Sequence, residues 1–205
     1  MKLTSETKFF IGIIAFTAVI IGFAAVIFSQ PPKPLPKDQL ITAGAQTRGP
    51  KDASHYLVEF SDFQCPACKA FSEEVDKLAV SYPDKLFIVY RHFPLPQHPE
   101  SKRAAQIAES AGTQGKFFEM GKKLFENQSD LSEYRYASIS AELGLDWSKI
   151  QTDLKNETYR NKVEADIAYG NRIGIRATPT FYLDGVKLTV NLPEDLSKQV
   201  DHILK

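Results

Sequence analysis

The pattern of apolar and polar positions begins with a long uncharged run. Residues 9–28 carry no charged side chain, and a helix of that length matches the roughly 30 Å hydrocarbon thickness of a bilayer. We predict a transmembrane helix. The alternative is a cleaved signal peptide, but its apolar region is usually about 7–15 residues long and ends at small residues. Lysines lie on both sides of the run, so its orientation stays open.

A proline-rich stretch follows the apolar run. Residues 30–39 read QPPKPLPKDQ, a composition that favours an extended spacer over packed structure. Residues 40–42 suggest a short strand within an otherwise irregular lead-in. We therefore expect an anchor over residues 1–30, a linker and lead-in over 31–47, and one domain over 48–205.

Strand and helix patterns alternate within that domain. Short β-branched and aromatic runs predict strands at residues 56–60 and 85–92, and apolar residues at helical spacing predict a helix over 66–80 between them. Several helical patterns occupy about residues 99–172. The dipeptide Asp184-Gly185 then predicts a type I′ hairpin, and a helix closes the chain over 193–205. This order predicts an α/β domain with a helical insertion.

Composition narrows the function. The chain has 43% hydrophobic residues, and its 25 basic residues balance 25 acidic ones. That is enough apolar content for a core, and a net charge of zero argues against a nucleic-acid partner. Composition therefore does not identify the function, which must be sought in individual side chains.

The chemistry-bearing residues are the two cysteines, Cys65 and Cys68, which lie where the first predicted strand gives way to a helix. A thiol at a helix N-terminus is favoured as the thiolate by the helix dipole and by free backbone N–H groups. Cys68 follows one turn later, on the same side of the helix. This spacing predicts a redox pair in which Cys65 attacks and Cys68 resolves the mixed disulfide.

Three plainer interpretations compete with a redox pair. A structural disulfide across two residues would stabilise the fold little, since loop closure is short. A metal site would need further ligands, and the four histidines show no paired spacing with the cysteines. Two inert buried thiols would not need Pro66 and Ala67 at a helix start. We expect no metal and no cofactor.

The domain contains the motifs FSDFQCPACKAF, YRHFPL with HPES, QGKFFEM and IRATPTFYLDG. Together these motifs resemble those of the bacterial DsbA-like thiol-disulfide oxidoreductases, including membrane-anchored BdbD-like members. The resemblance implies a thioredoxin-like fold in which Pro179 is a cis-proline and Thr178 pairs with substrate backbone. It also implies that Glu59 lies beneath the disulfide and relays protons to Cys68.

Further expectations follow from this resemblance. Substrate would bind across Pro66, Ala67 and the Thr178 loop, whereas His92 and His98 receive only a structural or groove role. Strongly oxidising members have histidine where this chain has Ala67, so we expect a less oxidising pair.

The leading hypothesis is a dithiol oxidase that introduces disulfides into exported proteins. It would be reoxidised by a DsbB-like membrane protein, and it would face outward from a single-pass anchor held in membrane lipid. The alternatives are an anchored reductase or isomerase and, without enzymatic activity, a peptide-binding chaperone.

Overall fold

The computed structural model describes residues 4–28 and 33–205. The chain divides into two compact units, Met1–Lys33 and Pro34–Lys205. The first contains one helix, α1 (Ser5–Phe28). Among residues 4–28 and 33–205, no helix is both long enough and apolar enough to cross a membrane. The membrane anchor therefore stays a prediction. Residue 29 of the predicted anchor and residues 30–32 of the predicted spacer lie outside the described residues.

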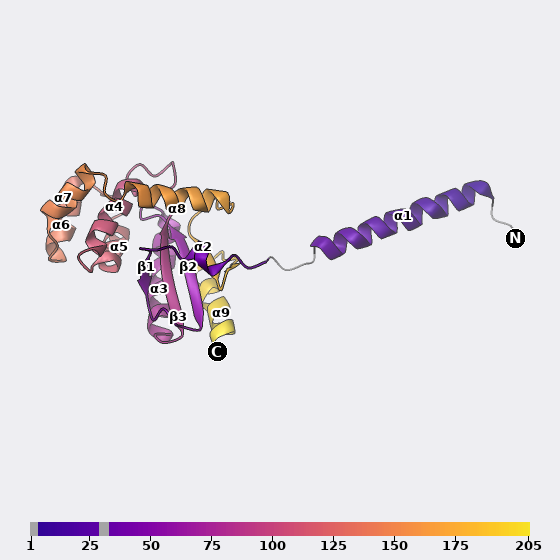
Figure 1. The fold of residues 1–205 in the computed structure, drawn as a ribbon, viewed down its shortest axis with the longest axis horizontal. Coiled ribbons are helices and arrows are strands. Elements are labelled where there is room, and N and C mark those ends of the chain that lie inside the picture. The colour runs from indigo at the N-terminus through magenta and orange to yellow at the C-terminus, as the bar shows by residue number, and fades with distance from the viewer. Residues whose placement is uncertain (1–3, 29–32) are drawn as a thin grey trace. The chain divides into compact units, whose positions relative to one another are not determined.

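The second unit is built on a five-stranded sheet with the order β1-β3-β2-β4-β5. The parallel pair β2 (His55–Ser61) and β3 (Leu86–His92) forms its centre. The other strands, β1 (Gln46–Arg48), β4 (Thr180–Leu183) and β5 (Val186–Lys187), add to it in antiparallel fashion. Figure 1 shows these central strands beneath the helical part of the domain.

Helices cover both faces of the sheet. Side chains alternate along β2 and β3, so that apolar residues point to either face and each face needs a covering layer. Leu57 and Ile88 face α3 (Pro66–Ser81) and α9 (Pro193–Leu204). Val58 and Val89 face the opposite way, into a cluster that includes Tyr169 of α8 (Arg160–Arg172). Each central strand is thus buried on both sides, which explains its nearly continuous apolar sequence.

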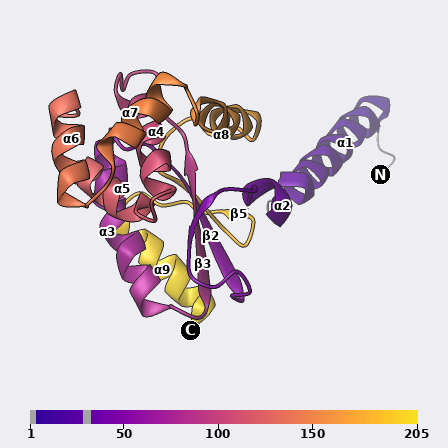
Figure 2. The same cartoon turned by 60° about the vertical axis from the view of Figure 1, so that its left-hand side comes forward.

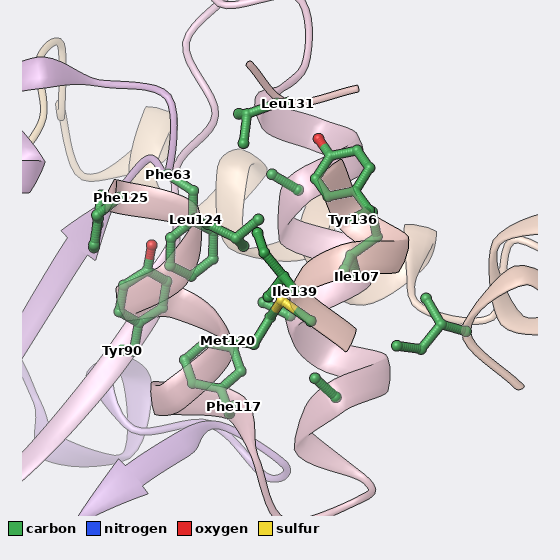
Figure 3. Close-up of a cluster of buried hydrophobic side chains, with 14 of the residues drawn as sticks. Phe63, Tyr90, Ile107, Phe117, Met120, Leu124, Phe125, Leu131, Tyr136 and Ile139 are labelled. Atoms are coloured by element: carbon green, nitrogen blue, oxygen red, sulfur yellow. The ribbon is translucent and has the colours of Figure 1, made fainter. Parts of the chain in front are cut away.

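The remaining long helices gather beyond one end of the sheet, as Figures 1 and 2 both show. They are α4 (Ser101–Gly112), α5 (Phe117–Glu126), α6 (Glu133–Glu142) and α7 (Trp147–Lys155). Their core joins that of the sheet through Phe63, Tyr90 and Phe117 (Figure 3). The helical insertion therefore packs directly against the residues that precede Cys65.

Most of the predicted elements are confirmed. Both central strands, the helix after Cys65, the helical insertion and the C-terminal helix occur where the sequence pattern places them. The hairpin has φ of 50° at Asp184 and 86° at Gly185, and positive values at both central positions are the mark of a type I′ turn.

The main difference between the predicted and the observed elements lies in the lead-in before residue 48. Residues 40–42 form no strand, because α2 (Lys37–Leu40) ends there and buries Leu40 completely. The preceding Leu35 donates its N–H to the Gly185 carbonyl at 2.8 Å. Its own carbonyl oxygen lies 2.4 Å from where a Cβ at position 185 would stand, so only glycine fits that close approach. The compact unit that contains the sheet begins at Pro34, and the predicted domain bounds stay a prediction.

Candidate active site

The two cysteines lie at the start of α3, directly after the loop that leaves β2. Cys65 is the extended N-cap residue, with φ −79° and ψ 122°, and Pro66 occupies the first turn. Proline is favoured there because its missing N–H would have no partner within the helix. The backbone N–H groups of Ala67 and Cys68, in this first turn, help to lower the pKa of Cys65.

The two thiols differ in burial and in acidity, and both are free. A hydrogen bond from the Cys68 side chain is the largest influence on Cys65 and, with help from Thr178 and the first-turn N–H groups, lowers the pKa of Cys65 to about 5. Cys68 is completely buried, and this burial raises its pKa well above 9.0. At neutral pH the site thus holds one thiolate, on Cys65, and one thiol, on Cys68.

Alkylation of Cys65 should report this acidity. Its pKa is lowered from 9.0 to about 5, so the reactive thiolate is fully present above about pH 6 and is lost as pH falls through 5. We expect the iodoacetamide rate, followed by mass spectrometry of the reduced protein, to be half-maximal near pH 5. Cys68→Ala is the matched variant, since losing the thiol donor should move this midpoint upward. A wild-type midpoint near pH 8 or 9 would contradict the assignment.

The loop opposite the cysteines contains the Thr178–Pro179 bond, which is cis. Thr178 is buried, and its carbonyl oxygen lies 3.5 Å from the Cys65 sulfur. Thr180 donates its hydroxyl to the Ala177 carbonyl at 2.8 Å and so fixes the start of β4. The structure brings this loop and Cys65 together as the resemblance implies, and substrate pairing at Thr178 stays a prediction.

The remaining predicted substrate positions lie on the surface. Pro66 and Ala67 are exposed at the start of α3, beside the largely buried Cys65. A partner that reaches the Cys65 sulfur must therefore pass close to both. Their role in binding stays a prediction.

Glu59 lies on β2 with only 4% of its surface exposed. Burial raises the pKa of this carboxyl to about 7, and Arg48 and Asp76 act on it with opposite signs. Its charge in turn contributes to the raised pKa of Cys68. The charge of Glu59 therefore acts on Cys68, and the proton relay stays a prediction.

Hydrogen bonds from distant segments hold the loop before Cys65. The Gln128 amide donates to the carbonyls of Phe63 and Cys65 at 2.9 and 2.8 Å. Asp62 is buried and accepts from the Gln64 N–H at 2.8 Å. Sequence reasoning missed Gln128 because 63 residues separate it from Cys65, and no local pattern marks such a contact.

The two histidines of the family-like motifs are anchored by carboxylates. His92 Nε2 lies 2.7 Å from Glu109, and both side chains are buried. His98 Nδ1 lies 2.7 Å from Asp62. These contacts suit the structural role expected of both histidines, and His98 in addition supports the loop that carries Cys65.

Comparison with known proteins identifies the family. The model for the family described as "Thioredoxin" matches residues 42–202. A thioredoxin-like oxidoreductase from Silicibacter pomeroyi DSS-3 superposes with a TM-score of 0.72 and 26% identity, covering 82% of this chain and 98% of that one. BdbD from Bacillus subtilis gives 0.69 and 22%, covering 85% and 97%. The alpha-DsbA2 thiol-disulfide exchange protein of Wolbachia pipientis gives 0.70 and 21%, covering 82% and 91%.

Curated relatives include longer proteins. The Na(+)/H(+) antiporter NhaA 1 of Mycobacterium sp. (strain KMS) is 34% identical over 183 residues, which cover 85% of this chain and 29% of the antiporter. A relative from Herminiimonas arsenicoxydans, also named Na(+)/H(+) antiporter NhaA, is 38% identical over 141 residues, covering 69% of this chain and 22% of that protein. The chain thus spans less than a third of either relative, and antiporter activity is not assigned to it.

Fold, dithiol site and family lead to one class of protein. The chain belongs to the thioredoxin family, and it carries a free cysteine pair at the start of a helix, opposite a cis-proline loop.

Proposed function

We propose that this chain is a dithiol oxidase that introduces disulfides into exported proteins. The observation that carries the proposal is the acidity of Cys65, whose pKa is lowered to about 5. A thiolate that is stable at neutral pH favours the reduced enzyme, and so makes the oxidised enzyme a better oxidant. This value lies between about 7 in thioredoxin and about 3.5 in DsbA.

The reaction runs through Cys65. A substrate thiolate attacks the Cys65 sulfur of the enzyme disulfide, the bond to Cys68 breaks, and Cys68 takes up a proton. The second substrate thiolate then attacks the substrate sulfur of the mixed disulfide and releases Cys65 as a thiolate. The substrate loses two electrons and the enzyme gains them. A second protein must then withdraw these electrons, and a quinone-linked membrane protein of the DsbB type fits that requirement.

The proposal places the domain outside the reducing cytosol, where substrate disulfides persist. Helix α1 exposes large apolar side chains within its own unit, including Phe16 at 68% and Phe23 at 69%. Apolar surface of this extent calls for a covering partner, and we assign that role to membrane lipid. Cell fractionation with a protease-protection assay tests both statements.

A reductase is the second candidate, and Ala67 is the residue that favours it. Histidine at this position would add a positive charge beside the Cys65 thiolate, whereas alanine adds none. The remaining stabilisation comes from Cys68, Thr178 and the helix N-terminus. If the reduction potential of the Cys65–Cys68 pair is low enough, the reduced pair donates electrons to substrate disulfides instead of accepting them.

Catalysed oxidation of a reduced, unfolded two-cysteine protein tests the function. The oxidised enzyme should transfer its disulfide stoichiometrically, as read by acid-quenched alkylation of the substrate. A Cys65→Ala/Cys68→Ala variant should transfer none, which separates redox catalysis from binding by a chaperone. If wild type reduces disulfide-bonded substrate but leaves the reduced substrate unchanged, the reductase replaces the oxidase.

A further inference from the structure

One glutamine side chain from the helical insertion holds the loop between β2 and α3. The amide nitrogen of Gln128 carries two N–H groups, and it donates to the Phe63 carbonyl at 2.9 Å and to the Cys65 carbonyl at 2.8 Å. The same Cys65 carbonyl accepts the Lys69 N–H at 3.2 Å, which is the first hydrogen bond of α3. Gln128 therefore binds on both sides of Gln64 and reaches the backbone of the attacking cysteine itself.

The peptide group between Phe63 and Gln64 is fixed at both ends. Its carbonyl accepts from Gln128, and its N–H donates to the buried Asp62 carboxylate at 2.8 Å. Hydrogen bonds that meet on one peptide group polarise and strengthen each other in a protein interior. The Cys65 N–H also donates to the Asp62 carbonyl at 3.0 Å. The backbone from Asp62 to Cys65 therefore has little freedom to turn.

Gln128 is itself held by the end of α5. It follows Asn127, whose backbone N–H and side-chain amide both donate to the Lys123 carbonyl, at 3.1 and 2.8 Å. Helix α5 also contacts the side chain of Phe63, whose ring centre lies 5.2 Å from that of Phe125 (Figure 3). The helical insertion thus contacts the loop before Cys65 through an aromatic ring and through an amide.

The position of the Cys65 backbone decides how well neighbouring groups stabilise its sulfur. The Cys68 side chain is the largest influence that lowers the pKa of Cys65, and Thr178 and the N–H groups of Cys68 and Ala67 add to it. Hydrogen bonds weaken steeply as their angles depart from the preferred range. A small rotation of the Cys65 backbone would therefore weaken several of these contacts at once. Gln128 opposes such a rotation, since it binds the Cys65 carbonyl.

We propose that Gln128 is a positioning residue, through which the helical insertion holds the Cys65 backbone and so sets how strongly the start of α3 stabilises the Cys65 thiolate. Its amide acts through two carbonyl oxygens rather than on a reacting sulfur. A more stable thiolate favours the reduced enzyme, so Gln128 also contributes to the reduction potential of the pair. This second effect rests on the proposed dithiol chemistry, whereas the effect on the thiolate does not.

Replacing the amide by an apolar chain tests the proposal. Gln128→Met removes both N–H donors and keeps nearly the same side-chain length. We expect the ionisation constant of Cys65, measured from the ultraviolet absorbance of its thiolate during an acid titration, to fall about tenfold, the scale of one or two lost hydrogen bonds. The equilibrium constant for oxidation of glutathione by the enzyme at pH 7 should fall by the same factor, which corresponds to about 30 mV. The two factors agree because the thiolate remains the main form of Cys65 at that pH.

Two further variants make this result decisive. Gln114→Met is the matched control, because the Gln114 side chain also bridges two segments, accepting the Asp146 N–H at 2.8 Å within the insertion. It should change either constant by less than about twofold, as expected of an independent site. Gln128→Asn keeps the amide on a chain one carbon shorter, so it should reach one carbonyl at most and give an intermediate result. It also replaces Gln128→Met should that variant fail to fold.

A purely structural role for Gln128 would give a different pattern. Urea unfolding of Gln128→Met should show a larger loss of stability in the reduced protein than in the oxidised protein, because only the reduced protein contains the thiolate. Equal losses in both forms, together with unchanged constants in Gln128→Met and Gln128→Asn, would overturn the proposal. Failure of the dithiol chemistry is separate, because wild type would then reach no equilibrium with glutathione while the thiolate titration still tests Gln128.

Discussion

Cys68→Ser is expected to convert the enzyme into a trap that holds covalent mixed disulfides through Cys65. Cys65 is the more accessible sulfur and carries the lowered pKa, whereas Cys68 is fully buried with a raised one. Without Cys68 the reduced protein still attacks a disulfide, but no internal thiol can displace the bound partner. Incubation with a disulfide-bonded test protein and non-reducing electrophoresis should therefore reveal a species that disappears on reduction.

Cys65→Ser is the matched control for that experiment. It keeps one buried thiol whose pKa lies above the neutral range, so it should trap essentially nothing at pH 7. The expected contrast is complete loss of complex rather than a partial decrease. Accumulation of complexes by Cys65→Ser and not by Cys68→Ser would reverse the roles assigned to the two residues.

Arg91→Met is expected to lower the free energy of unfolding by about 3–5 kcal/mol, because it leaves a buried carboxylate without its partner. Arg91 Nε donates to Asp166 at 2.6 Å, and the two side chains are only 2% and 5% exposed. The same guanidinium donates to the Leu40 carbonyl at 2.8 Å. Arg91 thus ties α8 and the last residue of α2 to the central strand β3. Urea unfolding followed by circular dichroism measures the change.

Two further variants complete the ion-pair test. Lys102→Met removes a cation from an exposed pair with Glu164, with 57% and 44% of the side chains accessible, and should cost at most about 1 kcal/mol. The double variant Arg91→Met/Asp166→Leu removes both buried charges and should recover much of the loss. A cost below about 1 kcal/mol for Arg91→Met would mean that solvent reaches Asp166 after the substitution.

The sequence contained enough information for the centre of the fold and the redox pair. Their signals are local: a β-branched strand, a proline one residue after Cys65, and an Asp184-Gly185 turn all act within a few residues. The roles of Thr178 and Pro179 were predicted differently, from the resemblance of whole motifs to those of a known family. Base rates alone favour a trans bond at Pro179.

The rest depends on contacts between distant segments. Gln128 and Asp166 reach partners 63 and 75 residues away, and no periodicity marks them. The expected strand at residues 40–42 failed for the same reason, since Leu40 is buried by the fold around it rather than by pairing with a neighbouring strand.

The equilibrium reduction potential of the Cys65–Cys68 pair tests the oxidase most directly. Titration against glutathione buffers at pH 7, with the thiol state read by alkylation, should give a value between about −120 mV for DsbA and about −270 mV for thioredoxin. Ala67→His should raise the potential, because an imidazolium beside the Cys65 thiolate stabilises the reduced form, and about 30 mV corresponds to 1.4 kcal/mol. A wild-type potential at or below about −270 mV would contradict the oxidase and identify a reductase in its place.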